Sequence, residues 1–122
     1  MSKIVHFEIS VDDAARAARF YEQAFGWQIE RWQGPIDYWL VSTGAPDDPG
    51  VGGALRQRDE LASGVVNHVG VDSVDAALER ILAAGGEALT PKMPIPGVGF
   101  MAYGRDTEGN VLGVFQEDAL AQ

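Results

Sequence analysis

The sequence contains no cysteine, few basic residues and no long apolar stretch. Without cysteine, the 122-residue chain has neither disulfides nor thiolate nucleophiles or ligands. Nine Lys and Arg residues against 18 Asp and Glu residues give a net charge of −9, which disfavours binding to nucleic acids and anionic membranes. No apolar stretch approaches the roughly 20 residues of a membrane-spanning helix, and the first residues lead directly into a strand pattern rather than a signal peptide. We therefore expect a cytoplasmic protein with no nucleic-acid or membrane partner.

Histidine is also scarce, and the two histidines lie in similar surroundings. His6 and His68 are each followed, seven residues later, by an Asp-Ala-Ala triplet, which gives an offset of 62 residues between the copies. Residues 50–57 match residues 109–116 at an offset of 59. Matches in the same order along the chain indicate a duplicated module. We expect one domain over residues 1–122, with module one at about 3–58 and module two at about 65–117.

The hydrophobic pattern predicts the order β-α-β-β-β in each module. In module one we expect a helix after Asp12 or Asp13, ended by Gly26, and strands at 3–11, 27–32, 37–43 and 51–58. In module two we expect a helix from Val74 to the Gly85-Gly86 pair and strands at 66–72, 87–89, 98–104 and 111–116. Three prolines predict that residues 90–97 form no regular structure. The last residues are expected to form a loose tail.

Alternation along the first strand separates its side chains into two sets. Phe7 and Ile9 point to one face, where the helix can cover them. His6 and Glu8 point to the other face, together with Ser10. The polar set then faces whatever the sheet encloses.

The two β-α-β-β-β modules, a His on the first strand of each and an Asp-x-x-Gly turn before the last strand resemble the vicinal oxygen chelate superfamily. Four stretches resemble more specifically its branch related to lactoylglutathione lyase. They are His6-Phe7-Glu8-Ile9, Gly53-Ala54-Leu55, residues 96–100 (Pro-Gly-Val-Gly-Phe) and residues 106–110 (Asp-Thr-Glu-Gly-Asn). The superfamily includes glyoxalase I, the extradiol dioxygenases and the bleomycin-resistance proteins. The resemblance covers nearly the whole chain. It implies an α+β fold of two tandem β-α-β-β-β modules, whose cupped mixed sheets enclose a cavity.

The resemblance also implies four positions that hold a divalent metal in glyoxalase I, on the first and last strands of each module. His6 falls on the first position and His68 on the third. The second falls at Ala54, or at Gly53 if the alignment shifts by one residue, and the fourth falls at Gly113. Neither last-strand position carries a donor atom, whereas a catalytic metal usually has three protein ligands. We therefore expect no metal and no other cofactor, with a divalent ion on His6 and His68 as the alternative.

Small residues at the two last-strand positions are expected to leave room for an organic ligand. Glu8 and the two histidines would supply polar contacts around that space. We predict that the residues touching the ligand are Trp39, Ala54, Phe100, Tyr103 and Gly113. For Trp39 and Phe100 the alternative is packing in the core.

Three functions remain open on the sequence. The first is a metal-free protein that binds a small, partly aromatic molecule, as the bleomycin-resistance proteins do. The second is a lyase, isomerase or other enzyme that uses His6, Glu8 and His68 as acid–base groups, with or without a weakly held divalent metal. The third is a structural or regulatory dimer with a vestigial cavity. In each case we expect a homodimer, because a module of this size leaves a sheet edge and an apolar helix face for a second copy to cover.

Overall fold

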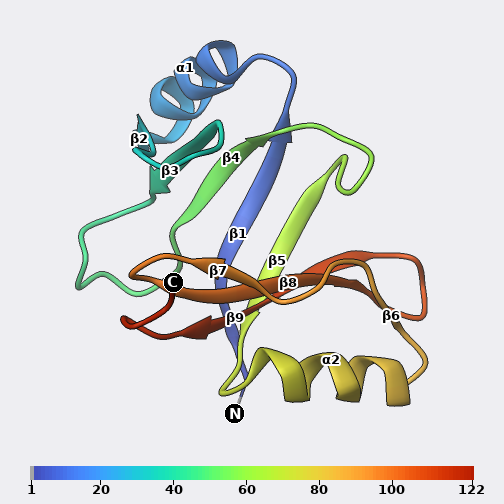
Figure 1. Ribbon diagram of the computed structural model, residues 1–122. Helices are drawn as coiled ribbons and strands as arrows, with labels where there is room; N and C mark the ends of the chain where they lie inside the picture. The colour runs from blue at the N-terminus through green and yellow to red at the C-terminus, as the bar shows by residue number, and fades with distance from the viewer. Residues whose placement is uncertain (1) are drawn as a thin grey trace. The chain divides into compact units, whose positions relative to one another are not determined.

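The computed structural model describes residues 2–122, which form nine strands and two helices in an α+β arrangement (Figure 1). Its contacts divide the chain into two compact units. Module one is used below for residues 6–66, and module two for residues 67–122 together with residues 2–5. Residues 2–5 join module two in part through a hydrogen bond from the Gly70 N–H to the Lys3 carbonyl, 2.8 Å. Module one has the predicted β-α-β-β-β order, and module two has the same order with one additional strand, so the predicted α+β fold is confirmed.

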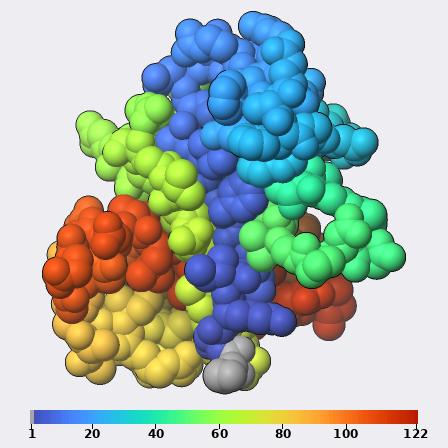
Figure 2. Space-filling model, turned by 180° about the vertical axis from the view of Figure 1, so that it is seen from behind, coloured from blue at the N-terminus to red at the C-terminus, as the bar shows by residue number. Residues whose placement is uncertain are grey.

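Module one is a mixed sheet with one helix on it. Its strands follow the order β2-β3-β4-β1; β4 and β1 are parallel, and the other neighbours are antiparallel. The elements are β1 (Ile4–Val11, whose first two residues belong to module two), α1 (Ala14–Phe25), β2 (Gln28–Arg31), β3 (Tyr38–Ser42) and β4 (Gly53–Gln57). Figure 2 shows α1 at the surface of module one.

Local sequence signals set both ends of α1. The Asp13 side chain accepts a hydrogen bond from the Arg16 N–H and so caps the first turn. Gly26 ends the helix with φ of 71°, a conformation that glycine adopts without a steric penalty. Between these ends, three alanines on one face of the helix allow it to lie close to the sheet: Ala14, Ala17 and Ala18.

The core of module one lies between α1 and the sheet. Its buried centre consists of Val11, Val41 and Leu55. Phe7 and Ile9 pack against this centre from β1, as the alternation predicted. The other face of the sheet is not covered by α1, and we call it the helix-free face.

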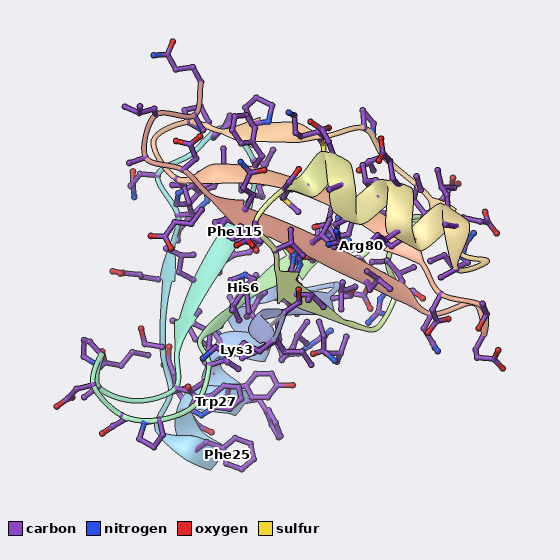
Figure 3. The ribbon with its side chains drawn as sticks, turned by 90° about the horizontal axis from the view of Figure 1, so that it is seen from below. Lys3, His6, Phe25, Trp27, Arg80 and Phe115 are labelled. Atoms are coloured by element: carbon purple, nitrogen blue, oxygen red, sulfur yellow. The ribbon has the colours of Figure 1, made fainter. Side chains whose placement is uncertain are left out.

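Aromatic rings gather at the end of α1. Tyr21 stacks on Trp27 with ring centroids 5.0 Å apart and an angle of 8° between the planes. Phe25 lies beside Trp27, with centroids 5.5 Å apart (Figure 3). Phe25 is nevertheless 63% exposed, and the adjacent Phe20 is 57% exposed. The cluster therefore extends from the core to the surface.

Module two repeats the plan. Its strands follow the order β5-β9-β8-β6, with β5 and β9 parallel and β7 added on β8. The elements are β5 (Val65–Gly70, whose first two residues belong to module one), α2 (Val74–Ala83), β6 (Glu87–Ala88), β7 (Met93–Ile95), β8 (Gly99–Arg105) and β9 (Val111–Glu117). The core lies between α2 and the sheet, centred on Val74, Ala77, Ala102 and Val114. Neither helix in residues 2–122 is long and apolar enough to cross a membrane.

Two expectations for module two are wrong. The proline-containing segment is not wholly irregular, because β7 pairs with β8 and places Pro94 opposite Phe100. β7 pairs only with β8, and an edge strand tolerates a residue without an N–H. The C-terminus is not a loose tail, because Ala121 is 3% exposed and its carbonyl accepts a hydrogen bond from the Gly97 N–H, 2.9 Å.

Candidate functional site

The helix-free face of module one carries a row of polar side chains on three neighbouring strands. Trp39, Val41 and Leu55 point to the helix, so the alternate residues Tyr38, Leu40, Ala54 and Arg56 point away from it. Strand pairing places Arg56 between Tyr38 and Ser10, and Ala54 between Leu40 and Glu8. Strand alternation thus assigns these residues to the helix-free face, and the register brings its polar groups together.

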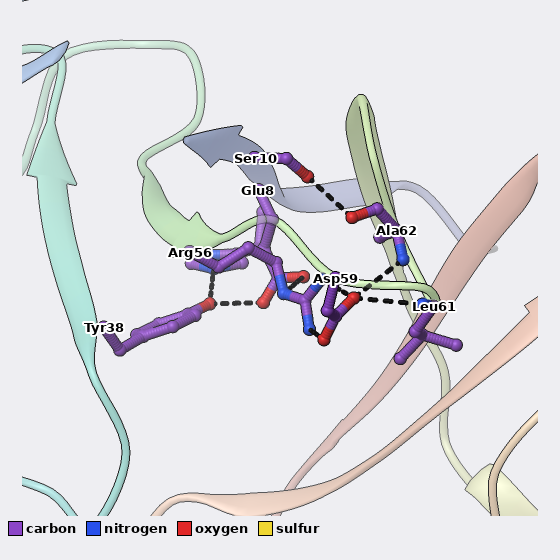
Figure 4. A network of polar contacts seen from close by, with 8 residues as sticks. Glu8, Ser10, Tyr38, Arg56, Asp59, Leu61 and Ala62 are labelled. Carbon is purple, nitrogen blue, oxygen red and sulfur yellow. Dashed lines mark hydrogen bonds and ion pairs between the residues drawn. The ribbon is translucent and has the colours of Figure 1, made fainter. Parts of the chain in front are cut away.

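Glu8 is at the centre of these groups and is 2% exposed. The Tyr38 hydroxyl donates a hydrogen bond of 2.7 Å to Glu8 Oε2. Arg56 Nε lies 3.6 Å from Glu8 Oε1, an ion pair beyond hydrogen-bond distance (Figure 4). A buried carboxylate costs several kcal/mol unless it is paired and hydrogen-bonded. The structure provides both compensations from residues of module one.

His6 extends the same chain of contacts. Its Nε2 lies 2.9 Å from the Tyr38 hydroxyl oxygen. Because the single hydroxyl proton of Tyr38 is directed at Glu8, His6 is the donor in this contact, with its proton on Nε2. The order His6–Tyr38–Glu8 therefore links the imidazole to the buried carboxylate through one phenol.

Asp59 completes the network from the loop after β4. Its carboxylate accepts hydrogen bonds from both terminal nitrogens of Arg56, at 3.2 and 3.1 Å, and from the backbone N–H groups of Leu61 and Ala62, at 3.0 Å each. The hydrogen bond from the Ala62 N–H lowers the pKa of Asp59 below its ordinary value of 3.8. Burial raises this pKa, and the Arg56 guanidinium lowers it further, so that the net shift is downward. Asp59 is therefore ionised at neutral pH.

In module two, His68 occupies the corresponding face. It is 3% exposed, and its ring meets the Tyr103 ring edge to face, with centroids 5.5 Å apart. Strand pairing places Gly113 between His68 and Tyr103. A Cβ atom on Gly113 would lie 2.2 Å from His68 Nδ1. The imidazole therefore lies directly over Gly113, which has to be glycine for the ring to fit.

The equivalence of His6 and His68 at an offset of 62 is wrong. Asp13 caps α1, whereas Ser73, not Asp75, caps α2. His6 and Val66 lie seven residues before the caps of α1 and α2, whereas Glu8 and His68 lie five residues before them. Strand pairing agrees, because Glu8 lies beside Ala54 and His68 beside Gly113. The Asp-Ala-Ala triplet was misleading because Asp75 lies inside the first turn of α2. The match of Ala54 with Gly113 at an offset of 59 remains.

The expected room at Gly113 is wrong as well, since the His68 ring fills it. Trp39 and Phe100 pack on the helix side of their sheets, which was the alternative for both. Ala54 and Tyr103 lie on the helix-free faces. Whether any of these five residues touches a ligand stays a prediction, as does a cavity shared by His6 and His68.

The residues present do not fit the divalent centre that the resemblance implies. The two last-strand positions, Ala54 and Gly113, lack donor atoms. Glu8, the nearest carboxylate on the first strand, already accepts from Tyr38 and pairs with Arg56. Within residues 2–122, no group of three or more His, Asp or Glu side chains lies close enough together to hold an ion. Glu8 therefore fits a carboxylate that is held by its protein neighbours better than it fits a metal ligand.

Sequence reasoning missed three residues of the network: Tyr38, Arg56 and Asp59. Alternation was a usable signal for the first two, because Tyr38 adjoins Trp39 and Arg56 adjoins Leu55 on strands with a clear apolar face. Asp59 had no such signal. Its role depends on the fold of the loop that returns its carboxylate to Arg56.

Sequence comparisons agree with the fold. Residues 3–44 match a family model described as bleomycin resistance protein-like N-terminal. A glyoxylase-like domain-containing protein of Didymella fabae is 32% identical over 113 residues, which cover 88% of each chain. A putative glyoxylase of Mycobacterium bovis is 23% identical over 113 residues, covering 89% of this chain but only 43% of that protein. The chain thus spans less than half of the mycobacterial relative.

Solved structures share the fold over nearly the whole chain. A hypothetical protein from Bacillus halodurans has a TM-score of 0.73 at 14% identity, covering 99% of this chain and 98% of the other. A methylmalonyl-CoA epimerase from Mycobacterium tuberculosis has a TM-score of 0.71 at 15% identity, covering 94% of this chain and 87% of the enzyme. At such identities the likeness concerns the fold alone.

The contact between Gly113 and His68 predicts a penalty for one added methyl group. Gly113→Ala forces the buried imidazole to move, and overpacking of this kind costs about 1–3 kcal/mol. Gly64→Ala is the matched control, because a Cβ there meets nothing within 4 Å, and a change below about 1 kcal/mol is expected. Chemical denaturation measures both free energies of unfolding. Equal values for the two variants would contradict the placement of His68.

The lowered pKa of Asp59 predicts a dependence of stability on pH. A carboxylate whose pKa is lower in the folded state contributes stability above its unfolded value of 3.8, and this contribution is lost as the pH falls through the folded value. Thermal melts of the wild type and Asp59→Asn should differ most near pH 6 and converge as the pH falls below 3.8. The effect is modest because the Asp59 side chain is 49% exposed. A difference that grows toward acid pH would contradict the assignment.

Proposed function

Because the chain belongs to the vicinal oxygen chelate superfamily, we propose that it is a small-molecule-binding protein of the glyoxalase and bleomycin-resistance type that lacks a complete metal centre. The ligand is a small, partly aromatic organic molecule held on the helix-free face of module one. Polar contacts come from His6 and Tyr38, and Leu40, 38% exposed, offers apolar surface beside them. A few fixed polar groups next to apolar surface are typical of such sites.

One observation carries this proposal: the Glu8 carboxylate is engaged by residues of its own module. With Tyr38 at 2.7 Å and Arg56 at 3.6 Å, it is neither an open metal ligand nor an unoccupied general base. A metal would have to displace both partners and would still lack last-strand donors at Ala54 and Gly113. The network instead holds Tyr38 and His6 in fixed positions on the sheet.

A metal-free enzyme is the second candidate, and the order His6–Tyr38–Glu8 favours it. A hydrogen-bonded carboxylate that orients an imidazole through a hydroxyl is suited to moving a proton at His6. His68, on the equivalent face of module two, would be a further acid–base group. The epimerases that share the fold are named for methylmalonyl-CoA, and this compound is therefore one of the substrates to test.

The test is a binding and turnover screen on dialysed, chelator-treated protein. The probes are bleomycin, methylmalonyl-CoA and the hemithioacetal of methylglyoxal with glutathione. We expect calorimetric binding of at least one probe without turnover, and elemental analysis with less than one divalent ion per chain. Tyr38→Phe should weaken binding roughly tenfold through the lost hydrogen bonds. Tyr21→Phe, a tyrosine on the helix side, is the matched control and should bind like the wild type.

Each other outcome decides against part of the proposal. Turnover without metal that is lost in Tyr38→Phe would favour the second candidate. One tightly held divalent ion per chain, with turnover abolished by a chelator, would overturn both. Absence of binding to every probe would count against the ligand class.

We also propose a homodimer located in the cytoplasm. The exposed rings of Phe20 and Phe25 support pairing, since contiguous apolar surface on a small protein commonly marks an interface. Sedimentation at micromolar concentration should give twice the 13.1 kDa mass of the chain. A monomer at that concentration would contradict the dimer.

A further inference from the structure

The guanidinium of Arg56 lies between two carboxylates, one buried and one at the surface. Its two terminal nitrogens contact the two oxygens of Asp59, Nη1 with Oδ1 at 3.2 Å and Nη2 with Oδ2 at 3.1 Å. Its Nε faces Glu8 Oε1 at 3.6 Å. The Arg56 side chain is 14% exposed, so water competes little for these contacts.

The two contacts differ in how firmly they fix the orientation of the guanidinium. The pair with Asp59 is a fork-to-fork arrangement, which fixes the plane and the direction of a guanidinium. The contact with Glu8 is longer than a hydrogen bond and cannot fix orientation by itself. Because the guanidinium is rigid, the fork on Asp59 determines where the Nε edge points.

Asp59 is itself held in place by its loop. Its Oδ1 accepts from the N–H groups of Leu61 and Ala62, each at 3.0 Å. The Ala62 carbonyl accepts a hydrogen bond from Ser10 Oγ on β1, 3.2 Å, two residues beyond Glu8 on the same face. The loop that follows β4 is therefore tied to the strand that carries the buried carboxylate.

We propose that Asp59 is a positioning residue of the module-one site: it holds the fork of Arg56 so that the Nε edge stays against the buried Glu8 carboxylate. Glu8 in turn keeps the Tyr38 hydroxyl, and through it His6, in one orientation. Asp59 acts through Arg56 and does not touch the ligand. Its effect on ligand binding rests on the proposed function, whereas its effect on Arg56 does not.

The Asp59→Asn substitution separates two roles of the side chain, which are to hold its own turn and to orient Arg56. The amide oxygen can take the place of Oδ1 and keep the bonds from Leu61 and Ala62, so the turn is retained. The amide nitrogen then takes the place of Oδ2 and sets a donor against Arg56 Nη2, which breaks the fork. Asp106→Asn is the matched control, because Asp106 accepts from the Glu108 and Asn110 N–H groups of another exposed turn.

Nuclear magnetic resonance of the ligand-free protein gives the first measurement. In Asp59→Asn we expect the Arg56 Nε–H signal to shift and its proton to exchange with water roughly tenfold faster, because the broken fork no longer holds the Nε edge against the Glu8 carboxylate. The amide signals of Leu61 and Ala62 should stay in place. In Asp106→Asn the Arg56 signal should be unchanged. An unchanged Arg56 signal in Asp59→Asn would overturn the proposal.

A double-mutant cycle gives the second measurement, with bleomycin as the probe. Asp59→Asn and Arg56→Lys should each weaken binding, and the double variant should bind no more weakly than Arg56→Lys alone, because both changes act through one group. If the two single losses of binding add up in the double variant, positioning through Arg56 is contradicted. This holds even if the amide signals of Leu61 and Ala62 move in Asp59→Asn. If bleomycin does not bind the wild type, the result counts against this ligand, and the Arg56 signal still decides the positioning.

Discussion

The buried carboxylate of Glu8 is the constraint on which the first module depends. A negative charge at 2% exposure is tolerated only with partners, and removing one partner of such a pair typically costs about 3–5 kcal/mol. Tyr38 and Arg56 supply those partners from two other strands, so β1, β3 and β4 have to stay in one register. The network therefore fixes the sheet and the polar groups on its helix-free face together.

The two modules carry chemically different side chains at the same position of the first strand. At equivalent places on the first strand stand Glu8 and His68, each beside a residue with little or no side chain on the last strand. In module one the charged group is compensated by a phenol and a guanidinium. In module two the imidazole lies over Gly113 and meets the Tyr103 ring edge to face. The small last-strand residues thus accommodate their own module's side chains, which gives them a role without a metal.

Much of the fold was predictable because its signals are local. Alternation in β1, the cap at Asp13 and the stop at Gly26 depend on neighbours in the chain, and all three appear in the structure. The site was predicted less well. Trp39 and Phe100 are aromatic and apolar, and only the sheet shows that they face the helices. The alignment of the histidines failed because an Asp can either cap a helix or lie in its first turn.

The sequence by itself determined the superfamily, the β-α-β-β-β order of each module and the lack of donor atoms at Ala54 and Gly113, since residue identity and periodicity are sufficient for these. Tertiary structure alone decided that Glu8 is paired with Tyr38 and Arg56, that His68 covers Gly113, and that Asp59 holds Arg56. These contacts join residues up to 48 positions apart, from Glu8 to Arg56. Which distant side chains meet depends on strand register and loop path, and no local pattern encodes either.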